Sequence, residues 1–164
     1  DEYDELMEKL MVDAERNEEK VWEILQAGVN FDATNVDGDT ALQLAVNYGN
    51  TPIVTILLQA GTDVDHVNND GDTALHIAAR QGYDIILQML LQAGADVNNA
   101  NTNGQTALHI ATLQGYNDIV QLLVKNRADV NALDSFGKTA LDYAISRRFH
   151  AVIQTLRQAA TSSE

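Results

Sequence analysis

The sequence predicts an all-α solenoid, in which similar helix–turn–helix units stack side by side. Four related segments, GDTALQLA, GDTALHIA, GQTALHIA and GKTALDYA, begin at residues 38, 71, 104 and 137, so the period is 33 residues. All ten glycines of the 164-residue chain fall on three positions of this period. Glycine adopts the backbone conformations that tight turns and helix ends require, so the repeated unit includes turns as well as helices.

Each unit is expected to run through a turn, a first helix, a tight corner, a second helix and a loop. A threonine that can cap the first helix recurs in every unit: Thr40, Thr73, Thr106 and Thr139. The expected caps of the second helices are Thr51, Asp84 and Asn117, and Pro52 fits a first helical turn. Apolar residues keep helical spacing, for example Leu75, Ala78, Ile86, Leu90 and Leu91.

These elements resemble the ankyrin repeat: G-x-T-A-L-H-x-A begins the units at Gly71 and Gly104, with glutamine or aspartate in place of the histidine in the other two, and G-A-D-V-N or a close variant follows each second helix. The resemblance covers essentially the whole chain and implies a curved solenoid with protruding β-turn loops. It implies N-terminal capping helices at 1–33, repeats at 34–66, 67–99 and 100–132, and a C-terminal capping repeat with a tail at 133–164. The first segment is acidic around an apolar face of Leu10, Val21, Ile24 and Leu25, and residues 161–164 are expected to form a frayed tail.

Two arginines depart from the family pattern. Arg127 and Arg148 stand where the other units have glycine. If their backbones take positive φ, each costs roughly 1 kcal/mol, which predicts a less stable C-terminal end. Alanine replaces the proline that usually follows the capping threonine, and because alanine favours helix the fold prediction is unchanged.

Charge and composition narrow the partner classes. The chain has 10 Lys and Arg against 24 Asp and Glu, a net charge of −14, which argues against nucleic acid and anionic membranes and favours a basic protein surface. There is no run of about 18 apolar residues that could span a bilayer, and no signal peptide is visible. The absence of cysteine excludes disulfides and thiolate metal sites. The expected compartment is the cytoplasm, with nuclear and exported locations as alternatives.

One stretch, GDTALHIAARQG, places Asp72, Thr73 and His76 within five residues and suggests a catalytic group. His76 recurs as His109, however, whereas a catalytic triad requires one oriented nucleophile. The resemblance implies that this histidine is structural and hydrogen-bonds near the turn of a neighbouring repeat. The sequence therefore predicts no enzyme activity, no catalytic residue and no cofactor.

The turn sequences NVDGD and NNDGD suggest a calcium loop. An EF-hand needs an acidic first position and a glutamate at the twelfth, but alignment on Gly71 puts His66 and Ile77 there. No metal site is predicted. The alternative is a weak cation site among the stacked carboxylates Asp37, Asp39, Asp70 and Asp72.

Recognition in ankyrin repeats falls to the turn tips and to the first-helix surface facing the concave groove. Mapped onto this chain, the resemblance implies Val36, Asp37, Asp39, Asn47 and Tyr48 in the first repeat; Asn69, Asp70, Asp72, Arg80 and Gln81 in the second; Thr102, Asn103, Gln105, Leu113 and Gln114 in the third; and Ser135, Phe136, Lys138 and Arg147 in the C-terminal cap. Tyr48, Leu113 and Phe136 are candidate anchors, because they are large apolar groups on a polar face. Trp22 is expected to pack within the N-terminal cap, with a contact on the convex side as the alternative.

The charge is graded along the chain. Lys and Arg against Asp and Glu give −8 for residues 1–33, −4 for 34–66, −3 for 67–99, 0 for 100–132 and +1 for 133–164. The sequence therefore predicts a non-catalytic protein-binding module, monomeric when unbound, whose partner carries a basic patch and an apolar anchor site. The alternatives are a regulatory fragment of a larger enzyme and an engineered binder. The resemblance also makes Asn98 and Asn131 possible substrates of an asparagine hydroxylase.

Overall fold

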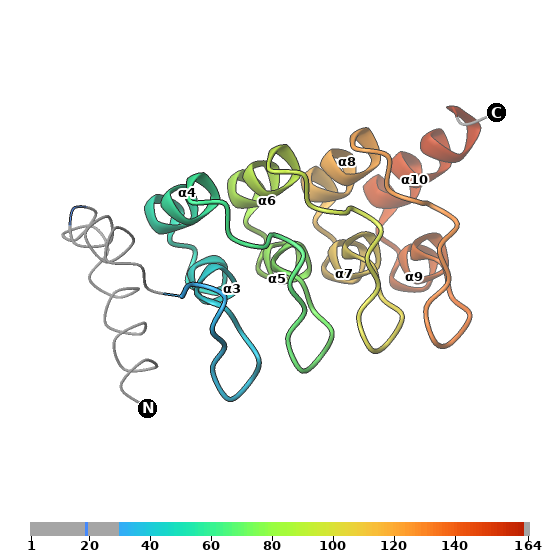
Figure 1. Ribbon diagram of the computed structural model, residues 1–164. Coiled ribbons are helices and arrows are strands. Elements are labelled where there is room, and N and C mark those ends of the chain that lie inside the picture. The colour runs from blue at the N-terminus through green and yellow to red at the C-terminus, as the bar shows by residue number, and fades with distance from the viewer. Residues whose placement is uncertain (1–18, 20–29, 163–164) are drawn as a thin grey trace.

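The computed structural model describes Glu19 and residues 30–162, in which every regular element is a helix. The helices are α3 (Ala41–Asn47), α4 (Thr51–Gln59), α5 (Ala74–Gln81), α6 (Asp84–Gln92), α7 (Ala107–Gln114), α8 (Asn117–Lys125), α9 (Ala140–Arg147) and α10 (His150–Ser162). Figure 1 shows two rows: α3, α5, α7 and α9 form one, α4, α6, α8 and α10 form the other, and hairpin-like turns project beside the first row. The predicted apolar face of the N-terminal cap, and Trp22, lie outside the described residues.

Each first helix begins at the threonine that the sequence predicts. The Oγ1 atom of Thr73 accepts a hydrogen bond from the His76 backbone N–H, and the Nδ1 atom of His76 accepts one from the Thr73 backbone N–H at 3.0 Å. This reciprocal arrangement is a capping box, and it recurs at Thr40, Thr106 and Thr139. The prediction of the first-helix caps is confirmed.

The predicted caps of the second helices are wrong by one residue. Asn50, Tyr83 and Tyr116 occupy the cap positions, whereas Thr51, Asp84 and Asn117 are the first helical residues. The Asn50 side chain accepts from the Ile53 N–H, but neither tyrosine makes a side-chain cap bond. Packing explains the tyrosines, because the ring of Tyr83 covers Gly49 in the preceding repeat and that of Tyr116 covers Gly82. Pro52 lies in the first turn of α4, as predicted.

The two arginines in glycine positions do take positive φ, 67° at Arg127 and 59° at Arg148. Arg148 ends α9 in the left-handed conformation that Gly82 and Gly115 adopt at the ends of α5 and α7. The expectation of a frayed tail from residue 161 is wrong for Thr161 and Ser162. Both are helical, and the hydroxyl of each donates to the Gln158 carbonyl at 2.9 Å.

The core lies between the two rows and continues from one repeat to the next. Equivalent leucines of the first helices, Leu42, Leu75 and Leu108, are at most 2% exposed, and Val54, Leu87 and Val120 of the second helices are fully buried. Burial of this repeated apolar set is the main stabilising term of the stack. Among the described residues, no helix is both long enough and apolar enough to cross a membrane.

Candidate protein-binding surface

The turns that project from the first row are hydrogen-bonded to one another. The backbone N–H of Asn69 donates to Asp37 O at 3.0 Å, that of Thr102 to Asp70 O at 3.1 Å, and that of Ser135 to Asn103 O at 3.0 Å. Each bond joins a turn tip to the tip of the next repeat. The four tips therefore form one continuous ribbon in a fixed position, which lowers the conformational entropy lost when a partner binds.

Each turn is also braced by one side chain at its base. Asn35, Asn68 and Asn101 each accept two backbone N–H bonds with their Oδ1 atoms. In the last turn Asp134 takes this role and accepts from Phe136 N and Lys138 N, both at 2.9 Å. Burial alone would raise the pKa of Asp134, but the Tyr143 hydroxyl and these two N–H groups outweigh it and lower the pKa below its usual value.

The histidines join neighbouring repeats, as the resemblance implied. His76 Nε2 lies 2.9 Å from the carbonyl oxygen of Gln105, and His109 Nε2 lies 3.0 Å from that of Lys138. Because the Nδ1 atom of His76 accepts from Thr73 N, its Nε2 must carry the proton and donate. Gln43 makes the same link in the first repeat, through Nε2 to Asp72 O at 2.9 Å. Thr73 and His76 are each 1% exposed and committed to these bonds, so the group that suggested catalysis is a brace.

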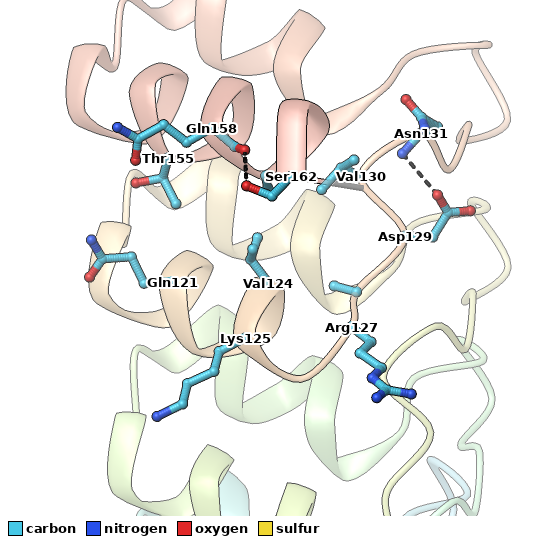
Figure 2. Close-up of a pocket in the computed structure, with 12 residues that line it drawn as sticks. Gln121, Val124, Lys125, Arg127, Asp129, Val130, Asn131, Thr155, Gln158 and Ser162 are labelled. Carbon is cyan, nitrogen blue, oxygen red and sulfur yellow. Dashed lines mark hydrogen bonds between the residues drawn. The ribbon is translucent and has the colours of Figure 1, made fainter. Parts of the chain in front are cut away.

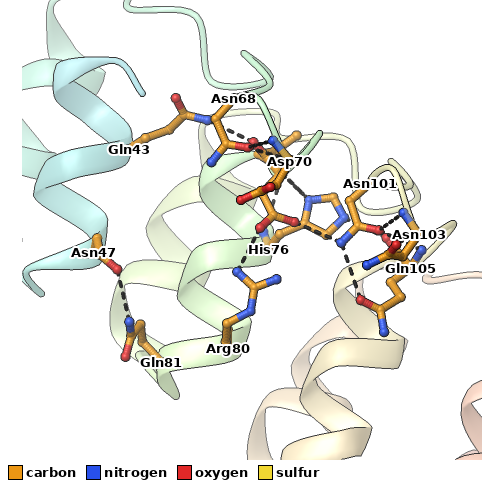
Figure 3. A network of polar contacts seen from close by, with 12 residues as sticks. Gln43, Asn47, Asn68, Asp70, His76, Arg80, Gln81, Asn101, Asn103 and Gln105 are labelled. Carbon is orange, nitrogen blue, oxygen red and sulfur yellow. Dashed lines mark hydrogen bonds and ion pairs between the residues drawn. The ribbon is translucent and has the colours of Figure 1, made fainter. Parts of the chain in front are cut away.

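Most of the predicted site residues are at the surface. The exposed ones are Val36, Asp37, Asn47, Tyr48, Asn69, Asp70, Gln81, Thr102, Asn103, Gln114, Ser135, Phe136, Lys138 and Arg147. Those that are half-buried are Asp39, Arg80, Gln105 and Leu113. Neighbouring first helices are tied together on this side, because Gln81 Nε2 donates to Asn47 Oδ1 at 3.0 Å (Figure 3).

Asp72 is the exception, because the prediction that it is exposed at a tip is wrong. Asp72 is 4% exposed, and its Oδ2 lies 2.8 Å from Nη1 of Arg80. Its Oδ1 accepts from Asn101 Nδ2 at 2.9 Å, so both carboxylate oxygens are engaged. The bond to Asn101 spans 29 residues and repeats between Asp39 and Asn68, so an Asp–Asn pair at this spacing was the signal that sequence reasoning missed.

The acidic turns crowd negative charge together. Burial raises the pKa of Asp39, and the charges of Asp37, Asp70 and Asp72 raise it further, while the Asn68 hydrogen bond acts in the opposite direction. Within the described residues, no group of three or more His, Asp or Glu side chains is arranged to hold a metal ion. The crowding is thus an electrostatic property of the first two turns, with Asp37 and Asp70 carrying its exposed charge.

Two of the three candidate anchors are well exposed, Phe136 at 79% and Tyr48 at 48%, while Leu113 is half-buried. The backbone of Phe136 is fixed by its bond to Asp134, so a rigid turn presents the ring. Sequence reasoning missed Ile145, which is 48% exposed. The equivalent residues Val46, Ala79 and Thr112 are fully buried by the following repeat, so the signal was the position of Ile145 in the last repeat.

The comparison with known families agrees with this architecture. The family described as "Ankyrin repeats (3 copies)" matches residues 10–101 and 86–163. The chain belongs to the ankyrin-repeat family. A search of curated proteins found no match. Ankyrin repeats are in general protein–protein interaction modules and typically non-catalytic. The ankyrin fold therefore sets the class of function, while the partner has to be inferred from the surface.

Proposed function

We propose that this ankyrin-repeat protein binds a partner protein through its binding face, defined as the four turn tips and the adjoining surface of α3, α5, α7 and α9. The observation that carries the proposal is the pairing of exposed apolar rings with a rigid ribbon of turns. Tyr48 is exposed on the first repeat, and Phe136 is exposed on the last repeat, where its backbone N–H is bonded to Asp134. Large aromatic groups on such surfaces are frequent binding hot spots.

The distribution of charge along the binding face supports a partner that has both a basic patch and an apolar site. Asp37 and Asp70 are exposed on the first two turns, whereas the last repeat exposes Lys138 and Arg147. A partner with a basic patch opposite the first two turns and an apolar site near Leu113 and Phe136 matches both ends. The charges then act mainly on the association rate and on its salt dependence. Through such binding the protein would act as an adaptor, an inhibitor or an assembly factor.

Affinity capture with the intact chain tests the anchor. A partner retained by the unchanged protein should be lost with Phe136→Ala and reduced with Tyr48→Ala. Ile85→Ala is the matched control, because Ile85 is 62% exposed but lies on α6, in the other row of helices. Capture that survives both anchor substitutions, or that Ile85→Ala abolishes, would contradict the proposed face.

Association kinetics with the captured partner test the role of charge. Asp37→Asn with Asp70→Asn should lower the on-rate at low salt and leave the off-rate nearly unchanged. Asp72 is unsuitable for this test, because its carboxylate is buried and paired with Arg80. An on-rate unaffected by the double substitution at low salt would refute electrostatic steering while leaving the anchor intact.

A further inference from the structure

The last repeat leaves a groove on a side of the molecule that the binding face does not use. It has a volume of about 800 Å³ and lies between α8, the loop that follows it and the end of α10 (Figure 2). Val124 and Val130 contribute apolar surface, while Asn131 and Ser162 line its polar edges. The surrounding repeats show why it is there.

In the earlier repeats the corresponding space holds the next loop of the stack. After each second helix the chain turns at a left-handed residue, Gly61, Gly94 or Arg127, and forms a loop. The loops bond to one another: Asp96 N donates to Asp65 Oδ1 at 2.9 Å, and Asp129 N donates to Asn98 Oδ1 at 2.7 Å. Along this series, the next acceptor is the side chain of Asn131.

No such loop follows α10 within the described residues. Ala160 stands where the left-handed residue would be, and α10 continues through it to Ser162, the equivalent of Asp96 and Asp129. The helix therefore passes beside loop 128–132 instead of turning to cover it. Within residues 30–162, no hydrogen bond to the Asn131 side chain is found, although Asn131 lines the groove.

The groove also differs in charge from the equivalent places in the stack. Lys125 replaces Gln59 and Gln92, and Arg127 replaces Gly61 and Gly94. Both cations are exposed at its edge, where Asp129 is the acidic residue among those that line it. A locally positive groove in a protein of net charge −14 favours an acidic occupant.

We propose that this groove binds a short, extended, acidic segment of a partner protein, which takes the position of the next loop of the stack. The segment donates a backbone N–H to Asn131 Oδ1, as Asp129 does to Asn98. It places a small apolar side chain against Val124 and Val130, as Val97 and Val130 pack against the core in their own loops. Its carboxylate lies near Lys125 and Arg127.

A peptide with the sequence of residues 94–100, GADVNNA, is the probe, because it is the chain's own loop. Titrated into the isotope-labelled 164-residue protein, it should cause saturable NMR shifts at Val124, Asn131 and Ser162. A peptide with lysine in place of aspartate should bind about fivefold more weakly, because a favourable pair of exposed charges becomes repulsive. Absence of saturable shifts at the groove, or shifts confined to the turn tips, would overturn the proposal.

Four variants at exposed positions sharpen the test without disturbing the core. Ser162→Trp fills the groove from the exposed end of α10 and should abolish the shifts, whereas Thr161→Trp, which does not line it, should preserve them. Lys125→Gln with Arg127→Gly restores the residues of the second repeat and should weaken binding about threefold. Phe136→Ala should leave peptide binding unchanged, which separates this groove from the binding face. Binding that Ser162→Trp retains would refute the assigned site.

Discussion

The interface between the second and third repeats and the open side of the last repeat use equivalent positions with different residues. Gly82 lies under the ring of Tyr116, where an added Cβ would be 3.0 Å from the nearest ring carbon, but its equivalent in the last repeat is the exposed Arg148. His76 reaches the next repeat, whereas its equivalent Asp142 accepts from Thr139 N within its own turn. The 33-residue period thus determines the backbone conformation at these positions, whereas contact with a following repeat determines which side chain occupies them.

The largest expected change in stability concerns one glycine position compared between two repeats. Gly71 and Gly137 both have positive φ, 73° and 71°, so alanine strains the backbone equally in each. A Cβ on Gly71 would lie 2.7 Å from the backbone nitrogen of Thr102, whereas one on Gly137 would have no atom of the described residues within 4 Å. Gly71→Ala should cost about 3 kcal/mol of unfolding free energy and Gly137→Ala about 1 kcal/mol, measured by urea denaturation. Equal losses would show that close approach between repeats does not require this glycine.

The histidine brace should give the next largest effect. His76→Ala removes the bonds to Thr73 and Gln105 and leaves a buried carbonyl without its donor, which should cost about 2 kcal/mol. His76→Gln should retain most of the stability, because Gln43 makes the same link in the first repeat. Denaturation of the two variants in parallel distinguishes the effect of losing the hydrogen bonds from the effect of losing side-chain volume. If glutamine were as damaging as alanine, the imidazole would have a role beyond the link.

The same brace makes stability depend on pH. Burial lowers the pKa of His76 below its usual 6.5, so the unfolded chain takes up the proton first as pH falls. The contribution of His76 is therefore complete above pH 6.5 and is lost as pH falls through the lower pKa of the folded state. Unfolding free energies of the unchanged protein and of His76→Gln, compared across this range, should converge toward acid pH. A constant difference would contradict the shifted pKa.

How far the sequence predicts this molecule depends on whether a residue acts within its repeat or across repeats. Thr73 caps a helix in its own unit, and the 33-residue period was enough to identify it. Asp72 was misassigned because its main partner outside its own repeat, Asn101, is 29 residues away. Tyr83 was missed as a cap because its ring packs on Gly49, and packing outweighed the capping preference of the neighbouring Asp84. Phe136 was correctly expected to be exposed, but its partner is not encoded in the repeat pattern.

Thr112 shows whether a polar side chain buried between repeats needs a hydrogen-bond partner. Its Oγ1 is buried and has no hydrogen-bond partner among the described residues, and the equivalent residues Val46 and Ala79 are apolar. Thr112→Val keeps the shape and removes the orphan hydroxyl, so the protein should gain about 1 kcal/mol in unfolding free energy. Thr106→Val is the contrasting control, because the Thr106 hydroxyl caps α7 and its loss should destabilise. A loss of stability in Thr112→Val would mean that the hydroxyl has a partner in solution.

The smallest predicted effect concerns the open side of the last repeat. Arg148 holds φ at 59° and its side chain is exposed, so it bears the strain of a left-handed residue. Arg148→Gly should relieve that strain and raise the unfolding free energy by up to about 1 kcal/mol. Arg148→Ala is the control, because it removes the charge but retains the Cβ and hence the strain. If the alanine variant gained as much as the glycine variant, charge rather than backbone strain would be the cost at this position, and the requirement for glycine would belong to the covered interfaces alone.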